Sequence, residues 1–177
     1  GTTYVGCKVG TNQLLAIKRV NGKSAVDQSL REGELQHELR ACPHIMPLID
    51  YRYFKPTMPE EYPRLFQAMP LAYTNGTGYN DIIIPLKTQD PTLYARLWID
   101  NTEQLLKGLA YMHQKKIYHL DLKADNILYM QEGSLRIADF GKAQKVNNST
   151  HQIDKDTLGN MERYAPEQFA FVRFLGK

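Results

Sequence analysis

The chain has 177 residues, of which 42% are hydrophobic and 23% are charged, a composition typical of a globular domain and unlike that of a disordered or collagen-like chain. The 22 Lys and Arg residues exceed the 19 Asp and Glu residues by three, too mild an excess to predict a nucleic-acid-binding surface. The mean hydropathy is −0.47, and no apolar run is long enough to cross a bilayer. The two cysteines are too few for a disulfide framework and favour a reducing compartment.

The first third of the chain predicts a small sheet with one helix. Short runs rich in Val, Ile and Leu alternate with turn residues, as in paired strands. A helix is expected between the second and third strands, beginning at a Ser24 cap and ending before Pro43, because its leucines recur at helical spacing. The expected elements are strands at 3–9, 13–20, 45–54 and 64–69, and a helix from 24 to about 40 with Leu30, Leu35 and Leu39 on one face.

The remainder of the chain is mainly helical in pattern. Residues 75–78 (NGTG) have the composition of a loop. Residues 98–113 predict a helix, because apolar residues recur there every three or four positions. Two short apolar pieces, at 127–130 and 135–138, flank a turn at Glu132-Gly133. The expected apolar helix face comprises Trp98, Thr102, Leu105, Leu106, Leu109 and Met112.

Four short motifs occur in order along the chain. They are LAIK at 15–18, HLDLKADN at 119–126, DFG at 139–141 and APE at 165–167. Each alone is weak evidence, because a tripeptide arises by chance in many chains. Together, in this order and at these separations, they resemble the signature set of the protein-kinase family. The resemblance covers nearly the whole chain and implies an α+β, bilobal fold, with a small antiparallel sheet and one helix in the N-terminal lobe (1–70) and a reduced helical C-terminal lobe (71–177).

Phosphoryl transfer requires a protein to position two reactants and to neutralise charge on the phosphates. The resemblance implies that Lys18, on a strand, holds the α- and β-phosphates of ATP and pairs with a carboxylate of the following helix. Glu32 is the preferred partner, since it lies at a family-like distance before residues 42–45 (CPHI). Glu34 and Glu38 are the alternatives, and two of the three carboxylates are expected on a solvated helix face.

The resemblance assigns metal binding and transfer chemistry to residues beyond 118. Mg²⁺ prefers oxygen ligands and shares them with phosphate, and Asn126 and Asp139 match the two metal ligands of the family. Asp121 matches the residue that orients the attacking hydroxyl and accepts its proton. Lys123 can stabilise the γ-phosphoryl group as its charge shifts in the transition state.

Adenine contacts follow from the same resemblance. Met69 corresponds to the gatekeeper. Pro70 comes next and costs nothing there, because the family uses only the carbonyl at that position and proline has no N–H to donate. The N–H and C=O of Ala72 are expected to make the next contacts, and Ala16 and Leu128 match the apolar roof and floor of the adenine slot.

Three further residues are interpreted from their places beside the motifs. Gly1 lies seventeen positions before Lys18, where the family has the last glycine of its phosphate-covering loop. His119 is interpreted as a structural brace rather than a catalyst. Asp125 has no family role and is expected to be a solvated loop carboxylate.

Two residues depart from the family pattern. Leu120 stands where many regulated kinases carry an arginine whose charge is neutralised by a phosphate on the activation loop. Its presence predicts activity that does not depend on phosphorylation of Ser149, Thr150 or Thr157. Asn160 stands where the family usually has a Thr that contacts the catalytic Asp and Lys, and its amide can form similar hydrogen bonds.

These residues predict a kinase that uses ATP and Mg²⁺, with Mn²⁺ as a substitute, to transfer the γ-phosphoryl group to a Ser or Thr hydroxyl of a protein. Lys123, two residues after Asp121, favours Ser/Thr over Tyr specificity. One alternative is a pseudokinase that acts as a binding module, which the presence of Lys18, Asn126 and both aspartates disfavours. The other is a small-molecule phosphotransferase of the aminoglycoside-kinase type, which Lys123 and the APE motif disfavour.

The chain ends ten residues after Glu167, whereas the family continues with further helices. Either a C-terminal region has been removed or this is a minimal kinase, and compact kinases of this kind resemble those that pathogenic bacteria inject into host cells. We expect a cytoplasmic protein, delivered to a host cytosol if it is such an effector. Its expected partner is a protein substrate, a host protein in the effector case, and neither nucleic acid nor membrane is expected to bind.

Overall fold

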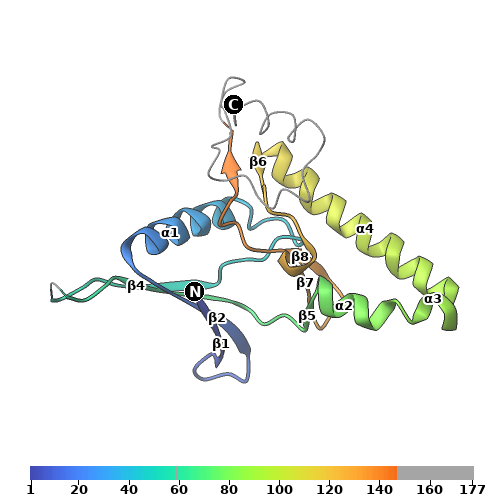
Figure 1. Ribbon diagram of the computed structural model, residues 1–177, viewed down its shortest axis with the longest axis horizontal. Coiled ribbons are helices and arrows are strands. Elements are labelled where there is room, and N and C mark those ends of the chain that lie inside the picture. Colours follow the sequence, from blue (N-terminus) through green and yellow to red (C-terminus); the bar gives the residue numbers. More distant parts are fainter. Residues whose placement is uncertain (59, 147–177) are drawn as a thin grey trace, which may run out of the picture.

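The structure, a computed structural model, describes residues 1–58 and 60–146 and combines a four-stranded sheet with helices and short paired strands (Figure 1). This mixture confirms the predicted α+β fold. None of the described helices is both long and apolar enough to span a membrane. Some predictions fall on residues outside the described ranges, namely Ser149, Thr150, Thr157, Asn160 and the APE motif at 165–167.

The N-terminal sheet is antiparallel throughout, with the strand order β1-β2-β4-β3. Its strands lie close to the predicted positions, except that the strand expected at 45–54 begins only at Asp50. Pro47 has no N–H with which to pair in a sheet, and Ile45 instead forms an isolated parallel bridge with Ile137. The strands are β1 (Thr2–Cys7), β2 (Leu14–Asn21), β3 (Asp50–Phe54) and β4 (Arg64–Pro70).

Helix α1 (Lys23–Glu38) lies against this sheet (Figure 1). The predicted Ser24 cap is wrong, because the N-cap residue is Gly22 and no side chain caps the helix. Gly22 has a φ of 92°, a conformation that glycine adopts without steric cost. This conformation allows the chain to turn sharply from β2 into the helix. Val26 of the helix is buried in one cluster with Leu65 of β4, so apolar packing holds the helix on the sheet.

Three helices follow the sheet. The prediction of a loop at 75–78 is wrong, because the Asn75 side chain accepts a hydrogen bond from the Gly78 N–H at 3.0 Å and caps a helix. The long helix begins earlier than predicted, because Asp90 caps it and a proline occupies its first turn. The helices are α2 (Gly76–Ile83), α3 (Leu86–Gln89) and α4 (Pro91–Gln114).

The chain after α4 forms short strands joined by loops. The two apolar pieces noted at 127–130 and 135–138 pair as an antiparallel hairpin, and Gly133 lies in the turn between them with a φ of 83°. Strands of two or three residues are not stable by themselves, so contacts with other elements must hold them. The elements are β5 (Thr74–Asn75), β6 (Ile117–Tyr118), the 3₁₀ turn Ala124–Asn126, β7 (Ile127–Tyr129), β8 (Leu135–Ile137) and β9 (Gln144–Lys145), with β5 paired to β7, β7 to β8 and β6 to β9.

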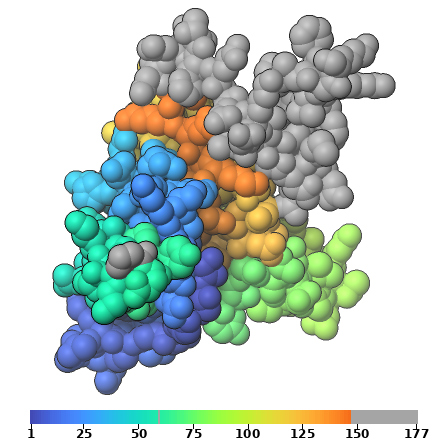
Figure 2. Space-filling view, turned by 60° about the vertical axis from the view of Figure 1, so that its left-hand side comes forward, coloured from blue at the N-terminus to red at the C-terminus, as the bar shows by residue number. Residues whose placement is uncertain are grey.

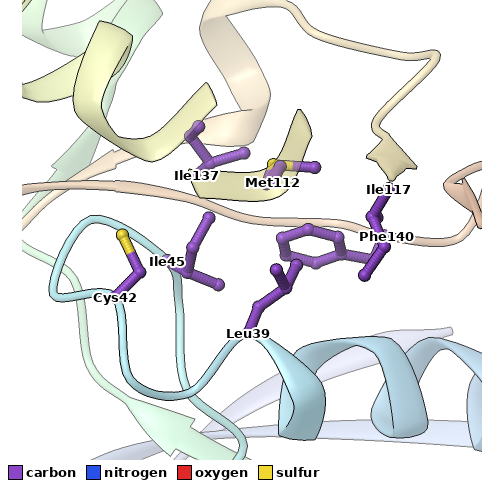
Figure 3. Close-up of a cluster of buried hydrophobic side chains, with 7 residues drawn as sticks. All are labelled: Leu39, Cys42, Ile45, Met112, Ile117, Ile137 and Phe140. Atoms are coloured by element: carbon purple, nitrogen blue, oxygen red, sulfur yellow. The ribbon is translucent and has the colours of Figure 1, made fainter. Parts of the chain in front are cut away.

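A buried apolar cluster joins the end of α1 to α4, β6 and β8 (Figure 3). On α4, Met112 is fully buried and Leu105 and Leu109 pack against the cluster, whereas Trp98 and Leu106 are more than half exposed. Among the described residues, packing therefore covers Leu105, Leu109 and Met112 of the predicted apolar face but leaves Trp98 and Leu106 exposed. The division into lobes at residue 70 stays a prediction. The cluster comprises Leu39, Cys42, Ile45, Met112, Ile117, Ile137 and Phe140.

Candidate active site

Strand β2 and helix α1 each contribute one charged side chain to an ion pair. Lys18 Nζ lies 2.8 Å from Glu32 Oε2. The lysine side chain is 26% exposed and the glutamate side chain only 6% exposed. Since a buried carboxylate is costly without a partner, the pair stabilises Glu32 in the interior while Lys18 stays accessible to an anionic ligand.

The other two candidate partners of Lys18 have different surroundings. Glu34 is exposed, as expected for a solvated helix face. Glu38 is half-buried, and Lys145 Nζ donates to both of its carboxylate oxygens, at 2.7 and 2.9 Å. Among the three carboxylates that the sequence left open, the structure therefore pairs Glu32 with Lys18.

The loop that follows β6 is held by a buried histidine. The His119 Nε2–H donates to the Ala138 carbonyl at 2.9 Å, and its Nδ1 accepts from the Asp121 N–H at 3.3 Å. This pattern needs a neutral ring, with one nitrogen protonated and the other free. Leu120 lies between these bonded residues with a φ of 60°, a conformation that non-glycine residues adopt rarely. His119 thus acts as a brace across the loop.

Burial and nearby charges have opposite effects on the pKa of this histidine. Burial lowers the pKa of His119, while the hydrogen bond to Ala138 and the negative charges of Asp139, Asp121 and Glu32 oppose that effect. The three carboxylates lie on elements that hydrogen bonds join: His119 bonds to Asp121 and to Ala138, the residue before Asp139, and Gln28, one helical turn before Glu32, bonds to Gly141. They come from different elements: α1, the loop after β6, and the segment after β8.

Asp121 lies between two lysines. Lys123 Nζ is 3.2 Å from its Oδ2 and Lys142 Nζ is 3.8 Å from its Oδ1. The Asn126 amide Nδ2 donates to the Asp121 main-chain oxygen at 2.8 Å. The Asp121 side chain is 14% exposed, so these contacts fix both its backbone and its carboxylate while a face remains open.

Asn126 and Asp139 present oxygen atoms that suit Mg²⁺. The Asn126 Nδ2 is committed to Asp121, which leaves the side-chain oxygen as a ligand atom. Asp139 has a φ of 64° and is exposed, while its neighbours Ala138 and Phe140 are buried. Within the described ranges, no group of three His, Cys, Asp or Glu side chains could hold a metal. The oxygens of Asn126 and Asp139 are the kind of donor that Mg²⁺ combines with phosphate oxygens.

The predicted adenine-slot residues meet where the sheet adjoins β7. Ala16 pairs with Met69 across β2 and β4, and Pro70 is the next residue on β4. Met69, Ala72 and Leu128 all pack against one buried cluster. The structure brings these five residues into one region of the molecule.

Gly1 lies at the start of β1, beside β2. Thr3 pairs with Lys18 in the sheet. A Cβ on Gly1 would lie 2.8 Å from the Arg19 carbonyl oxygen, so a side chain would not fit without a shift. Close backbone approach therefore explains a glycine at this position.

Asp125 has partners that the sequence analysis missed. Its Oδ1 accepts a hydrogen bond from Thr77 Oγ1 at 2.7 Å and a longer one from Asn75 Nδ2 at 3.5 Å. Nearby, a Cβ on Gly76 would lie 2.7 Å from the Ala124 carbonyl oxygen. Asp125 is exposed, as expected of a solvated carboxylate, and it also fastens the candidate catalytic loop to the start of α2.

Two further residues of the site were not singled out from the sequence. Lys142, directly after the DFG motif, lies beside Asp121, and its adjacency to the motif is the signal that could have identified it. Gln28 donates to the Gly141 carbonyl across a separation of 113 residues. No local pattern predicts a contact over that distance.

Comparison with known proteins agrees with this geometry. Residues 1–171 match the family described as the protein kinase domain, so the chain belongs to the protein kinase domain family. Together with the fold, this membership confirms the resemblance carried by the four motifs.

Several curated kinases are similar to the chain. A Saccharomyces cerevisiae serine/threonine-protein kinase (BCK1/SLK1/SSP31) is 29% identical over 167 residues, covering 94% of the chain and 11% of that protein. A probable serine/threonine-protein kinase of Dictyostelium discoideum is 28% identical, covering 94% of the chain and 32% of the relative. The Caenorhabditis elegans mitogen-activated protein kinase sma-5 is 33% identical, with coverages of 88% and 30%. The chain spans a third or less of the length of these relatives.

Proposed function

We propose that this chain transfers the γ-phosphoryl group of ATP to a Ser or Thr hydroxyl of a protein substrate. The observation that carries the proposal is the Lys18–Glu32 ion pair, together with the hydrogen bonds that join its helix to Gly141 and join His119 both to Asp121 and to Ala138, the residue before Asp139. The Ser/Thr acceptor is supported by Lys123, which lies 3.2 Å from Asp121, and by the names of similar kinases from yeast and Dictyostelium.

Each site residue has a role that its surroundings support. Lys18, oriented by Glu32, would bind the α- and β-phosphates. Asn126 and Asp139 would hold Mg²⁺, and Mn²⁺ offers the same oxygen chemistry; when bound, the ion neutralises charge on the phosphates. Adenine would bind between the side chains of Ala16 and Leu128, against the segment that runs from Met69 through Pro70 to Ala72.

Asp121 would orient the acceptor hydroxyl and accept its proton as the new O–P bond forms, while the bond between the γ-phosphorus and the oxygen shared with the β-phosphate breaks and ADP leaves. Its backbone is held by Asn126, and its carboxylate lies between Lys123 and Lys142. These lysines place positive charge where the γ-phosphoryl group would develop negative charge in the transition state, a form of electrostatic stabilisation.

We further propose that activity does not require phosphorylation of the activation loop. Leu120 introduces no positive charge before Asp121, so no arginine there needs a phosphate partner. The test is the triple Ala substitution of Ser149, Thr150 and Thr157, for which we expect phosphoryl transfer to stay within about threefold of the original chain. Abolished activity would contradict this proposal.

The deciding experiment is radiolabel transfer from Mg-ATP to a generic protein substrate and to a panel of small alcohols. We expect incorporation into protein Ser or Thr, identified by mass spectrometry, and its loss in Asp139→Asn. Nucleotide binding without transfer would favour a pseudokinase, and transfer only to a small alcohol would favour a small-molecule phosphotransferase. Retained transfer in Asp139→Asn would overturn the site assignment.

Cellular context is a separate part of the proposal. A cytoplasmic location agrees with the two free cysteines, Cys7 and Cys42. The alternative of a secreted effector depends on the small size and on departures in the activation segment, and the relatives named above, from yeast, Dictyostelium and Caenorhabditis, lend it no support. A protein substrate is the partner that the family implies.

A further inference from the structure

Helix α1 contacts the segment after Asp139 at two points. Near the start of the helix, Gln28 Nε2 donates to the Gly141 carbonyl oxygen at 2.7 Å. At its end, Lys145 Nζ donates to both carboxylate oxygens of Glu38, at 2.7 and 2.9 Å. Ten residues of helix separate the two points, or about 15 Å at 1.5 Å per residue. The two contacts therefore define the angle of the helix relative to the segment after Asp139, and not only its distance from that segment.

The surfaces between these two points are incompletely packed. Leu35 and Ala143 pack against the buried cluster that contains Phe140. Beside them lies a hollow of about 470 Å³, whose lining includes Arg31 and Glu32. Figure 2 shows the orange segment lying directly against the blue surface of the helix. We call the interface between helix α1 and residues 139–145 the seam. Because apolar contact covers only part of it, the polar contacts at its two ends contribute to fixing its geometry.

Both sides of the seam carry residues of the candidate active site. Glu32, which pairs with Lys18, lies between Gln28 and Glu38 on the helix. Asp139 lies two residues before Gly141 on the other side. The contacts therefore join the phosphate-binding ion pair to one proposed metal ligand.

The same segment is also tied to the loop that carries Asp121. In the backbone, β9 pairs with β6, with Ile117 opposite Lys145 and Tyr118 opposite Gln144. The Val146 N–H donates to the Lys116 carbonyl at 2.8 Å. The backbone of Lys145 thus pairs with the strand that leads into the loop carrying Asp121, and the side chain of Lys145 binds helix α1.

We propose that Gln28, Glu38 and Lys145 are positioning residues that hold helix α1 on residues 139–145, so that the Lys18–Glu32 pair and Asp139 assemble together. The inference rests on the proposed kinase function and extends it to how the site is kept assembled. All three groups belong to the unmodified side chains, so no phosphate is needed to make these contacts. None of the three is among the residues proposed above to bind nucleotide or acceptor, so they would act through Glu32 and Asp139.

The first test removes the donor at Gln28. Gln28→Glu keeps the size of the side chain but presents an acceptor to the Gly141 carbonyl, so the bond is lost and the two oxygens repel. We expect kcat/KM to fall about fivefold to tenfold and the Mg²⁺ concentration for half-maximal rate to rise, with little change in melting temperature. Gln89→Glu, the same change on the exposed helix α3, is the matched control and should alter neither value.

The second test exchanges the charges of the ion pair. Glu38→Lys and Lys145→Glu should each lower kcat/KM about threefold to tenfold, since each places like charges together. The double variant should recover to within about twofold, because the attraction is restored in reverse. Single variants at the original rate, or a double variant no better than the worse single one, would overturn the proposed role.

A nucleotide-binding measurement separates failure of this inference from failure of the proposed function. If the original chain transfers no phosphate, the shift of melting temperature with Mg-ADP takes the place of the rate. A weaker shift for Gln28→Glu, but not for Gln89→Glu, supports the positioning role, and equal shifts refute it. If the original chain does not bind Mg-ADP at all, the proposed function and this inference both fail.

Discussion

The N-terminal sheet and the segment from 116 to 146 are built in different ways. Within the sheet, strands of five to eight residues pair in continuous register, and the positive φ angles of the neighbouring turns fall on glycines. In the later segment the strands are two or three residues long. All three described non-glycine residues with positive φ, Lys116, Leu120 and Asp139, lie there.

In the sheet, regular pairing fixes the conformation of the strands, whereas in the later segment surrounding contacts impose the conformation of single residues. The ladder of β2 places Lys18 by regular pairing, which local sequence favours. Leu120 and Asp139 instead hold conformations that their sequence disfavours, and such strain persists only when surrounding contacts determine it. In this molecule those contacts include the bonds between His119 and Ala138 and between Ala138 N–H and the Asn126 carbonyl. The contrast can be tested from either side.

The largest expected effect comes from breaking the chemistry of the later segment without disturbing its shape. Asp121→Asn keeps the size of the side chain but removes the proposed proton acceptor, so we expect phosphoryl transfer to fall by about 10²–10⁴-fold. The melting temperature and the binding of Mg-ADP should change little. Steady-state kinetics measure the rate of transfer, and thermal shift measures the melting temperature and the binding of Mg-ADP. An unchanged rate would show that another group accepts the proton.

The next largest effect is expected from a substitution in the N-terminal sheet. Lys18→Met leaves the buried Glu32 carboxylate unpaired, so we expect a loss of about 2 kcal/mol in the free energy of unfolding, together with loss of transfer. The double variant Lys18→Met/Glu32→Leu removes the unpaired charge and should recover most of the stability but none of the activity. Denaturant unfolding measures the first quantity. Recovered activity in the double variant would show that the pair is only structural.

A third prediction concerns the buried brace in the later segment. Burial lowers the pKa of His119 below its usual 6.5, so the unfolded chain binds a proton more readily than the folded one. Stability should be constant above about pH 6.5 and decrease as the pH falls toward the folded-state pKa, by at most about 1.4 kcal/mol per pH unit for one proton.

The control for this prediction is His119→Gln, which cannot titrate. Its stability will be lower overall, but its slope between pH 7 and pH 5 should be shallower than that of the original chain. Thermal unfolding across that range measures both slopes. Equal slopes would mean that other groups cause the pH dependence.

The smallest effect tests the connection of α2 to the catalytic loop. Asn75→Ala removes the side chain that accepts from the Gly78 N–H and reaches Asp125, and should cost about 1 kcal/mol. Asn75→Ser retains a capping oxygen and should recover most of this loss. If the two variants unfold alike, the cap does not stabilise this helix.

The sequence predicted the regular elements well where one local pattern was sufficient. Strands β1 and β2 follow from runs rich in Val, Ile and Leu around a turn, and the turn at Glu132-Gly133 lies between the two apolar pieces that pair as β7 and β8. Two of the errors arose where a polar side chain changed the outcome. Asn75 and Asp90 both cap helices, and each reads as a loop residue from composition alone.

By itself, the sequence determined which chemical groups this protein has and in what order, because motif residues such as Lys18, Asp121 and Asp139 are recognised by type and spacing. Only the tertiary structure decided which carboxylate meets Lys18, that Glu38 binds Lys145, and that Asp125 fastens a helix. The physical reason is that pairing between distant side chains depends on how helices and strands pack, whereas local propensity acts over only a few neighbouring residues.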